Sequence, residues 1–392
     1  MQTEPTTLSS KLILLMAIAT GVAVANNYYV QPLLDTIAQA FGISHALAGS
    51  VVTAAQLSYG LGLFFLVPLA DLVERRRMIV LLMLLATSGL FVNAIAPSVS
   101  WLLVGTAITG GCSVVAQVLV PLAATLSAPE QRGKAVGTVM GGLLLGILLA
   151  RVVAGTISSL LSWQAVYWVA AVAMLICTVS LWRSLPKYQP QVSLSYRQLL
   201  GSVISLFKTE PVLAQRSFLG ALSFAMFTLF WTPLAFVLAN PPYEYSDAVI
   251  GLFGIAGVAG VVAAKWAGKL ADGGKGNWGS WIGWIAGLVS WLLLFLADHS
   301  LLSMLFGIVL LDLAVQMAHV SNQNVIYALQ PEARNRLNAG YMTSYFAGGA
   351  IGSYISVVLY QWHGWFAVCC GGVMLSLVAI TYLAATQRKS QA

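Results

Sequence analysis

The chain has 392 residues, of which 59% are hydrophobic and only 8% are charged, and its formal net charge is +7. Soluble domains carry roughly 25% charged residues, so two or three soluble domains of this length are excluded. Lipid is the solvent that tolerates such a surface. The basic excess then indicates the Lys and Arg bias of cytoplasmic loops, and no nucleic-acid partner is expected. The four cysteines lie in apolar runs without metal-ligand spacing, so neither metal, cofactor nor disulfide framework is predicted.

A membrane-spanning helix needs roughly 20 apolar residues. A long polar break in the middle of the chain predicts a linker with a short amphipathic helix around Tyr196–Phe207. The predicted domains are an N-terminal six-helix bundle over 1–185, a cytoplasmic linker over 186–215 and a C-terminal six-helix bundle over 216–392. The twelve predicted spans lie at about 11–34, 46–70, 78–96, 101–127, 134–161, 165–185, 216–238, 248–270, 278–296, 301–328, 338–361 and 365–385.

Basic residues fall on one side of this arrangement. If the N-terminus is cytoplasmic, 18 of the 19 Lys and Arg residues lie in cytoplasmic loops, in the linker or at the termini. The remaining one, Arg151, lies inside the fifth predicted span, and the outer loops hold none. This segregation predicts a multi-pass protein of the inner (plasma) membrane with both termini in the cytoplasm.

The two halves share short segments at an offset of about 201–202 residues. Transporters that consist of two related halves bind their substrate near the midplane, between the halves. The matching pairs are Pro68-Leu-Ala-Asp71 with Lys269-Leu-Ala-Asp272, Pro129-Glu-Gln-Arg132 with Pro331-Glu-Ala-Arg334, and Trp163-Gln-Ala-Val166 with Trp365-Phe-Ala-Val368.

Nearly the whole chain resembles the major facilitator superfamily, and within it the twelve-helix drug:proton antiporters. The best motif is the loop signature G-x-L-A-D-R-x-G-R-R, whose first half is kept at Gly268–Asp272. The first copy, Val67–Arg76, keeps the acid and the basic pair but replaces both glycines. Gly142 and Gly146 are similar to the start of the antiporter motif of the fifth span. Thr106 stands where the family pattern has an arginine in the fourth span.

The resemblance implies the major facilitator fold, in which two pseudo-symmetric six-helix bundles enclose a central cavity lined by the first, fourth, seventh and tenth helices. It also implies efflux by alternating access and a charge relay at the inner side that holds one state and breaks as the halves rock. For Asp71 and Asp272, which the resemblance places in this relay, the alternative is an exposed loop ion pair worth ~0–1 kcal/mol. The gating residues implied in this way are Asp71, Arg75, Arg76, Asp272, Arg132 and Arg334.

Only two formal charges lie deep within the predicted spans, Arg151 and Asp312. Charged residues inside a membrane are costly and mark function by default. Asp312 lies about 12 residues from the outer end of its span, ~18 Å deep, where a carboxyl could load and release a proton. Arg151 cannot shed its proton, so it needs an anion, carbonyl groups or water. For Asp312 the alternative is a protonated or paired structural Asp. For Arg151 the alternatives are a pair with Asp312, an anionic substrate held by the guanidinium, a lock between the halves, or snorkelling toward the outer face.

The tenth predicted span carries a polar stripe. Asp312, Gln316, His319 and Gln323 follow the spacing i, i+4, i+7, i+11 and share one helical face. Buried polar groups need partners, so this face is predicted to line a cavity, with His319 as a proton relay or a hydrogen-bonding wall residue.

Aromatic and amide residues gather near prolines in the first and seventh spans, where Pro32 bends or ends the helix. The alternative for the tyrosines is anchoring at the membrane interface. The candidate substrate-binding residues are Asn27, Tyr28, Gln31, Gln117, Trp231, Gln316, Asn322 and Gln323.

The function predicted from these features is proton-coupled export of a small amphipathic compound by a secondary transporter that works as a monomer. The expected partners are the substrate, protons and the lipid bilayer. A sugar or metabolite uniporter or importer is the alternative within transport. The sequence has no H-E-x-x-H or nucleotide-binding motif, and its four histidines are scattered, so an enzyme is not predicted. A sensor or channel fits the repeat and the deep charges less well.

Overall fold

The computed structural model describes residues 9–190, 195–272, 276–330 and 333–391, and the regular elements within these ranges are helices. The N-terminal half contains α1 (Ser10–Ala25), α2 (Leu34–Phe41), α3 (His45–Phe65), α4 (Arg75–Ala94), α5 (Val99–Cys112), α6 (Val115–Leu126), α7 (Arg132–Leu160) and α8 (Trp163–Ser184), with the 3-10 turns η1 (Gln31–Leu33), η2 (Val67–Asp71) and η3 (Pro129–Gln131).

The amphipathic helix predicted for the linker is α9 (Tyr196–Thr209), which begins with a capping box at Ser195 and Gln198. The C-terminal half contains α10 (Pro211–Trp231), α11 (Leu234–Ala239), α12 (Asp247–Leu252), η4 (Phe253–Gly257), α13 (Val258–Asp272), α14 (Gly276–Leu294), α15 (Leu301–Leu329) and α16 (Arg334–Gln391).

Eight helices of the described chain are long and apolar enough to cross a bilayer. One of them, within α16, is two helices joined at His363 and Gly364, where Gly364 has the left-handed φ of +63° that favours glycine. The fold class is therefore the predicted one, an all-α integral membrane protein with twelve transmembrane helices in two six-helix bundles. Three shorter apolar helices complete the twelve: Ser10–Ala25, Asp247–Gly260 and Trp278–Leu294.

Several spans are broken along their length, and prolines account for two of the breaks. The first span is α1, an irregular stretch, η1 and α2, with Pro32 inside η1. The seventh is divided into α10 and α11 at Pro233. Proline lacks the N–H that continues a helical hydrogen-bond ladder, so backbone groups are freed at both places. The fourth span, predicted as one helix, is divided between α5 and α6 at Ser113 without a proline.

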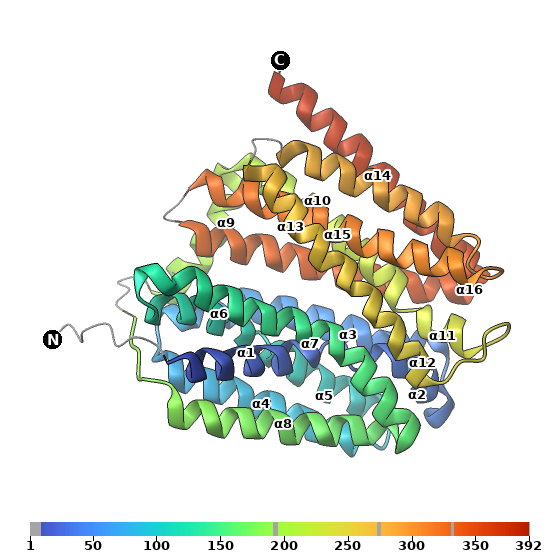
Figure 1. The fold of residues 1–392 in the computed structure, drawn as a ribbon, viewed down its shortest axis with the longest axis horizontal. Helices are drawn as coiled ribbons and strands as arrows, with labels where there is room; N and C mark the ends of the chain where they lie inside the picture. The colour runs from blue at the N-terminus through green and yellow to red at the C-terminus, as the bar shows by residue number, and fades with distance from the viewer. Residues whose placement is uncertain (1–8, 191–194, 273–275, 331–332, 392) are drawn as a thin grey trace.

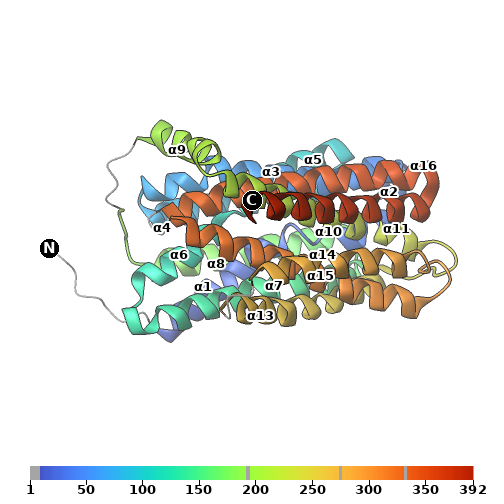
Figure 2. The same ribbon diagram turned by 90° about the horizontal axis from the view of Figure 1, so that it is seen from above.

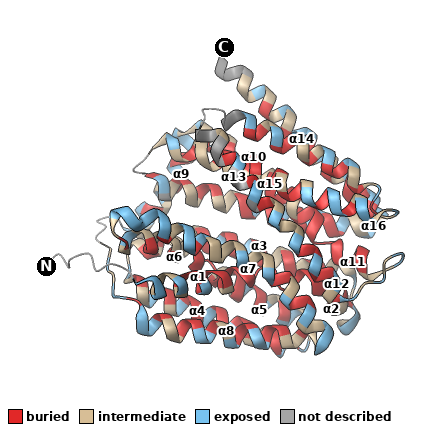
Figure 3. Cartoon of the chain, in the orientation of Figure 1, coloured by how far each residue is buried: buried red, intermediate tan, exposed pale blue. Residues whose placement is uncertain are grey.

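Helices α1–α8 lie together on one side of the molecule and α10–α16 on the other, as Figure 1 shows. In Figure 2, α9 lies at the same end as the N-terminus, and α2 and α11 lie at the opposite end. We call these the linker end and the far end. Large apolar side chains such as Leu160, at 77% exposure, and Trp362, at 73%, cover outward-facing surfaces, whereas buried residues face the interior of the bundles (Figure 3). This is the distribution expected of a protein in lipid.

The two halves meet through close backbone contacts near the far end. A Cβ atom at Gly155 of α7 would lie 2.1 Å from the backbone oxygen of Asp247, and one at Gly251 of α12 would lie 2.4 Å from that of Arg151. Helices α7 and α12 therefore touch backbone to backbone at two points. Near the same interface, the hydroxyl oxygens of Thr53 and Ser353 are 2.8 Å apart.

Glycines of the fifth and eleventh spans pack within each half instead. A Cβ at Gly142 or Gly146 would lie 2.2 or 2.3 Å from backbone oxygens of α1. Cβ atoms at Gly348 and Gly352 would lie 2.1 and 2.3 Å from backbone oxygens of α10. Small residues of this kind let helix backbones approach in a membrane.

Replacing Gly155 or Gly251 with alanine should loosen the contact between the halves, because the added methyl group has no room unless the backbones separate. We expect double electron–electron resonance between spin labels at Ala40→Cys and Glu244→Cys, both exposed at the far end, to show longer distances in either variant. Gly137→Ala on α7 is the matched control, since a Cβ there meets nothing within 4 Å. Identical distance distributions in all variants would contradict this account of the contact.

Candidate functional site

A cavity of about 890 Å³ lies between the two halves, within the size range of small-molecule sites. It extends from Arg151 and Asp312 toward Asp71, Arg75 and Arg334 at the linker end. Its remaining polar lining comes from both halves, as the repeat predicted for a transporter. These residues include Asn27, Tyr28, Tyr59, Gln117, Gln316, His319, Gln323 and Tyr345.

Arg151 lies at the end of this cavity that is away from the linker end, and contacts of its guanidinium fix its position. Its side chain is buried, with 3% of the residue exposed, and its Nε donates a 2.6 Å hydrogen bond to Gln31 Oε1. The guanidinium carbon lies 3.9 Å from the ring centroid of Trp231, 5.1 Å from that of Tyr28 and 5.6 Å from that of Phe227. Cation–π contacts of this kind stabilise a desolvated cation by roughly 2 kcal/mol. Within the described chain, Nη2 has no hydrogen-bond partner.

Asp312 is equally buried and shares Trp231 with Arg151. The indole Nε1 of Trp231 donates to Asp312 Oδ1 at 3.2 Å. The salt bridges within 4.0 Å among the described residues do not include an Arg151–Asp312 pair. The direct pair that the sequence left open is therefore replaced by an arrangement in which one tryptophan contacts both groups.

Two glycines of η4 leave space for the side chains of Arg151 and Asp312. A Cβ at Gly254 would lie 3.0 Å from the Cβ of Arg151, and one at Gly257 would lie 3.4 Å from Asp312 Oδ2. The eighth span therefore approaches the charged pair with backbone rather than with side chains. Nothing in the periodicity of the sequence distinguishes these two glycines from the other 34 in the chain.

The polar stripe of α15 faces the cavity, whereas the nearby Asn322 does not. Gln316, His319 and Gln323 line the cavity, and His319 Nδ1 lies 2.9 Å from the hydroxyl oxygen of Tyr341. Asn322 is 1% exposed, is absent from the described cavity lining, and accepts a 3.4 Å hydrogen bond from Arg216. The structure therefore places Asn322 on another face of α15, outside the described cavity lining, and its role as a substrate contact stays a prediction.

Of the candidate binding residues in the first, fourth and seventh spans, three line the cavity and two lie outside its described lining. Asn27, Tyr28 and Gln117 line it, and Gln117 Nε2 lies 3.5 Å from the hydroxyl oxygen of Tyr59. Gln31 and Trp231 lie behind this lining, where they hold Arg151. These two residues therefore act on the cavity through Arg151 and Asp312.

The predicted gating residues make contacts inside their own halves. Asp71 pairs with Arg75 one turn away at 3.0 Å, and Arg75 Nε also donates to the backbone oxygen of Ala70 at 3.1 Å. Arg76 donates to the backbone of Leu185, still in the N-terminal half.

Arg132 and Arg334 are exposed and donate to backbone oxygens of Ser127 and Tyr327, each in the same half as the arginine. The side chain of Asp272 lies outside the described residues. The contacts of the described gating residues at the linker end stay within one half, so a charge relay between the halves stays a prediction.

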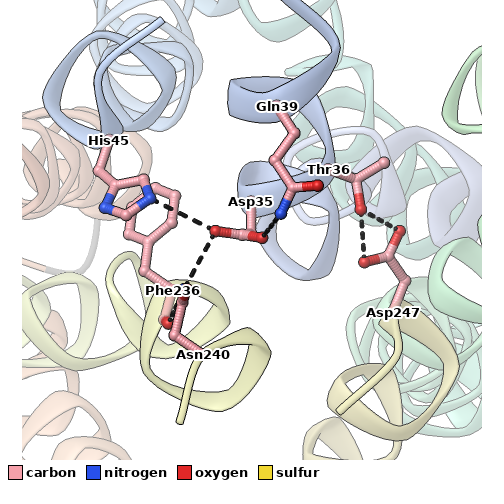
Figure 4. Close-up of polar contacts among 7 residues, drawn as sticks. All are labelled: Asp35, Thr36, Gln39, His45, Phe236, Asn240 and Asp247. Carbon is pink, nitrogen blue, oxygen red and sulfur yellow. Dashed lines mark hydrogen bonds and ion pairs between the residues drawn. The ribbon is translucent and has the colours of Figure 1, made fainter. Parts of the chain in front are cut away.

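Polar contacts that the sequence did not reveal join the halves at the far end (Figure 4). Asp35 of α2 accepts a 3.3 Å hydrogen bond from Asn240 of the C-terminal half, and it lies 3.4 Å from His45 Nε2. The His45 ring stacks on Phe236 at 4.3 Å between centroids. One carboxylate therefore connects α2, α3 and the end of α11.

Asp247 forms a second far-end connection from the C-terminal half. Its carboxylate accepts hydrogen bonds from Thr36 at 2.8 and 2.9 Å and from Ser158 at 2.6 Å. The next residue, Ala248, donates its backbone N–H to Ser159 at 2.9 Å. Asp35 and Asp247 carried a signal in the sequence, because both are acids at the outer ends of predicted spans where positive charge is absent.

Comparison with known proteins identifies the family. Residues 16–282 match the family model of the Major Facilitator Superfamily. The chain belongs to the Major Facilitator Superfamily. It is 54% identical over 371 residues to the transporter YgaY of Escherichia coli O157:H7, covering 95% of this chain and 94% of that protein. It is 30% identical to the transporter SCO4007 of Streptomyces coelicolor, covering 93% and 85% of the two chains.

Solved structures of other superfamily transporters share the fold. A bacterial homologue of the human lysosomal transporter Spinster, in an inward-facing and occupied conformation, has a TM-score of 0.76 at 13% identity and covers 97% of both chains. The nucleoside transporter NupG has a TM-score of 0.78 at 15% identity, covering 95% of this chain and 99% of that one. This superfamily chain is a membrane transporter and not a member of an enzyme family. Its assignment to the drug:proton antiporters stays a prediction.

Removing the Asp247 carboxylate should weaken far-end closure in this superfamily transporter. Asp247→Ala loses the hydrogen bonds from Thr36 and Ser158, and a hydrogen bond to a charged group contributes about 1.5–3 kcal/mol. We expect the distance between labels at positions 40 and 244 to become longer and more widely distributed.

Asp247→Asn retains an acceptor oxygen and should show a smaller change. Asp298→Asn, in the turn after α14, is the control for the loss of one acidic charge near this end. If Asp247→Ala leaves the distances as they are in the parent, these hydrogen bonds do not hold the far end closed.

Proposed function

We propose that this chain is a proton-coupled secondary transporter that moves a small amphipathic compound across the inner membrane by alternating access. The observation that carries the proposal is Asp312, a carboxyl buried on the wall of the central cavity and joined to Arg151 through Trp231. A carboxyl at this depth can change its charge when water reaches it from one side and then from the other. The cavity supplies both the substrate site and the route for water.

The orientation implied by the basic residues places both termini and the linker end in the cytoplasm. In that orientation the cavity extends toward the cytoplasm, and the far-end contacts of Asp35, Asp247 and Gly155 close the outer side. The structure then represents the inward-facing state of the cycle. The outward-facing state requires those contacts to break while the linker end closes.

Export driven by an inward proton gradient is the direction predicted from the resemblance. It requires antiport, in which the substrate and the proton compete for the cavity. A neutral or cationic substrate that hydrogen-bonds to the ionised Asp312 carboxylate would compete in this way. The aromatic wall formed by residues such as Phe224 and Phe227 would hold its apolar part.

Import by proton symport is a second candidate, and the closeness of Arg151 to Asp312 favours it. The two charges act on each other electrostatically across Trp231. When Asp312 takes up a proton, the positive charge of Arg151 is no longer offset by that carboxylate. Proton binding would then make the cavity more attractive to an anion, and the two would move together.

Asp312→Asn should abolish coupling while keeping the shape of the site, because the amide oxygen can still accept from Trp231. In proteoliposomes loaded with a substrate found by a growth-protection screen, an imposed pH gradient should drive flux through the parent protein. The variant should show only flux that follows the substrate gradient, with accumulation reduced at least about tenfold, as expected when a step worth ~1.4 kcal/mol or more is lost.

Asp298→Asn, which lies outside the cavity lining, should behave as the parent. Gradient-driven accumulation that survives Asp312→Asn unchanged would remove the coupling role of Asp312. Flux that ignores the pH gradient in the parent itself would favour a uniporter.

A further inference from the structure

We propose that the central cavity binds an amphipathic monoanion, a carboxylate on an apolar body, and that the carboxylate docks on the free edge of the Arg151 guanidinium. This inference names the substrate class and rests on the proposed function of the cavity. It depends on the contacts of Arg151, on the other charges of the cavity and on the aromatic residues around it.

Arg151 is already oriented as a binding group. Its Nε is occupied by Gln31 at 2.6 Å, and the ring of Trp231 lies 3.9 Å from the guanidinium carbon. These two contacts fix the position of the guanidinium, so little conformational entropy is lost when a ligand binds. The donor that has no partner in the described chain, Nη2, belongs to a residue that is 97% buried and lines the cavity.

An unpartnered donor on a buried cation is costly, and an anion relieves that cost most effectively. The guanidinium is planar, and its N–H groups point outward in that plane, where they match the two oxygens of a carboxylate. Because the Trp231 ring stacks against the guanidinium, a ligand approaches along the edge instead. A cationic ligand would be repelled by the charge of Arg151, and a neutral one would supply no counter-ion to it when Asp312 is protonated.

The remaining charges of the cavity favour the same sign of ligand. The acids among its described lining residues are Asp71 and Asp312, and the arginines are Arg75, Arg151 and Arg334. Asp71 is paired with Arg75, so Arg334 adds positive charge near the linker end. A cavity with positive charge at its mouth and in its interior attracts anions from solution.

The apolar part of the ligand would meet aromatic side chains close to Arg151. Phe224 stacks on Tyr345 at 4.3 Å between centroids and lies edge-on to Phe346 at 5.0 Å. These residues and Phe227 line the cavity. A flat or elongated apolar group extending from the carboxylate would lie against these rings, and such contacts add free energy beyond the area they bury.

The position of Asp312 sets how the anion and the proton influence each other. An ionised Asp312 repels the anion and offsets the charge of Arg151, whereas a protonated Asp312 does neither. The anion therefore binds best to the protonated protein. For this substrate class the proton and the substrate move in the same direction, which is the second of the two coupling modes.

The test compares three probes with one apolar body and different head groups: 4-phenylbutyrate, 4-phenylbutanol and 4-phenylbutylamine. Isothermal titration of the purified full chain in detergent should rank the carboxylate first, the alcohol second and the amine last. Arg151→Gln should weaken carboxylate binding by roughly 10- to 100-fold, as expected for a charge-assisted hydrogen bond, and should leave alcohol binding within about twofold.

Arg151→Lys keeps the charge but loses the planar edge, and it should fall between the parent and Arg151→Gln. Arg183→Gln, an exposed position on α8 outside the cavity lining, is the matched control and should bind as the parent does. Thermal unfolding of each variant shows whether a loss of binding is a loss of fold, and the lysine variant provides the comparison if the glutamine variant does not fold.

The inference is overturned if the amine or the alcohol binds best, if none of the three probes binds, or if Arg151→Gln and Arg183→Gln bind the carboxylate equally well. These outcomes differ from a failure of the proposed function. If the amine binds best and its binding is lost in Asp312→Asn, the anion proposal is wrong and export by antiport is supported. Carboxylate binding that depends on Arg151, without any flux in proteoliposomes under a pH gradient, would support the anion site and count against the proposed proton-coupled transport.

Discussion

The arrangement around Arg151 depends on burying one permanent positive charge in the middle of a membrane protein. The cost of that burial is offset by the hydrogen bond that Arg151 donates to Gln31, by the Trp231 ring at 3.9 Å and by the nearby carboxylate of Asp312. The breaks at Pro32 and Pro233 lie next to the residues that supply these contacts. The interruptions of the first and seventh spans therefore belong to the same feature as the charge.

The two ends of the molecule are held by different kinds of contact. At the far end, α7 and α12 touch backbone to backbone, and Asp35 and Asp247 form hydrogen bonds across the halves. The described gating residues at the linker end keep their bonds within one half, as the Asp71–Arg75 pair does. Hydrogen bonds typically contribute about 1 kcal/mol net, so a few of them can close one end without making the closed state irreversible. Such a balance suits a protein whose proposed function requires both ends to open in turn.

Sequence reasoning recovered what depends on composition and periodicity. Hydropathy and the charge map predicted the twelve helices, and the cost of buried charge singled out Arg151 and Asp312. The i, i+4, i+7, i+11 stripe predicted the cavity face of α15 and was correct for Gln316, His319 and Gln323.

Periodicity could not show which helix lies opposite each face, so several contacts between helices were not predicted. Asn322 is adjacent to Gln323 in the chain but points toward Arg216 in another contact. The double contact of Trp231 and the approach of Gly254 to Arg151 join residues far apart in the sequence. Asp35 and Asp247 were visible as acids near span ends, but their partners depend on how the two halves dock. That docking is a tertiary property that local patterns do not encode.

The central claim is that protonation of Asp312 and binding of an anion at Arg151 favour each other. Proton exchange on ligand binding tests it most directly. In this experiment 4-phenylbutyrate is added to the full chain in weakly buffered detergent solution, at a pH where the probe is ionised. A pH indicator records the protons that are taken up or released on binding. The account predicts net proton uptake of up to about one proton for each bound ligand, absent in Asp312→Asn, because the anion favours the protonated carboxyl. Proton release on binding, or uptake that persists in Asp312→Asn, would contradict it.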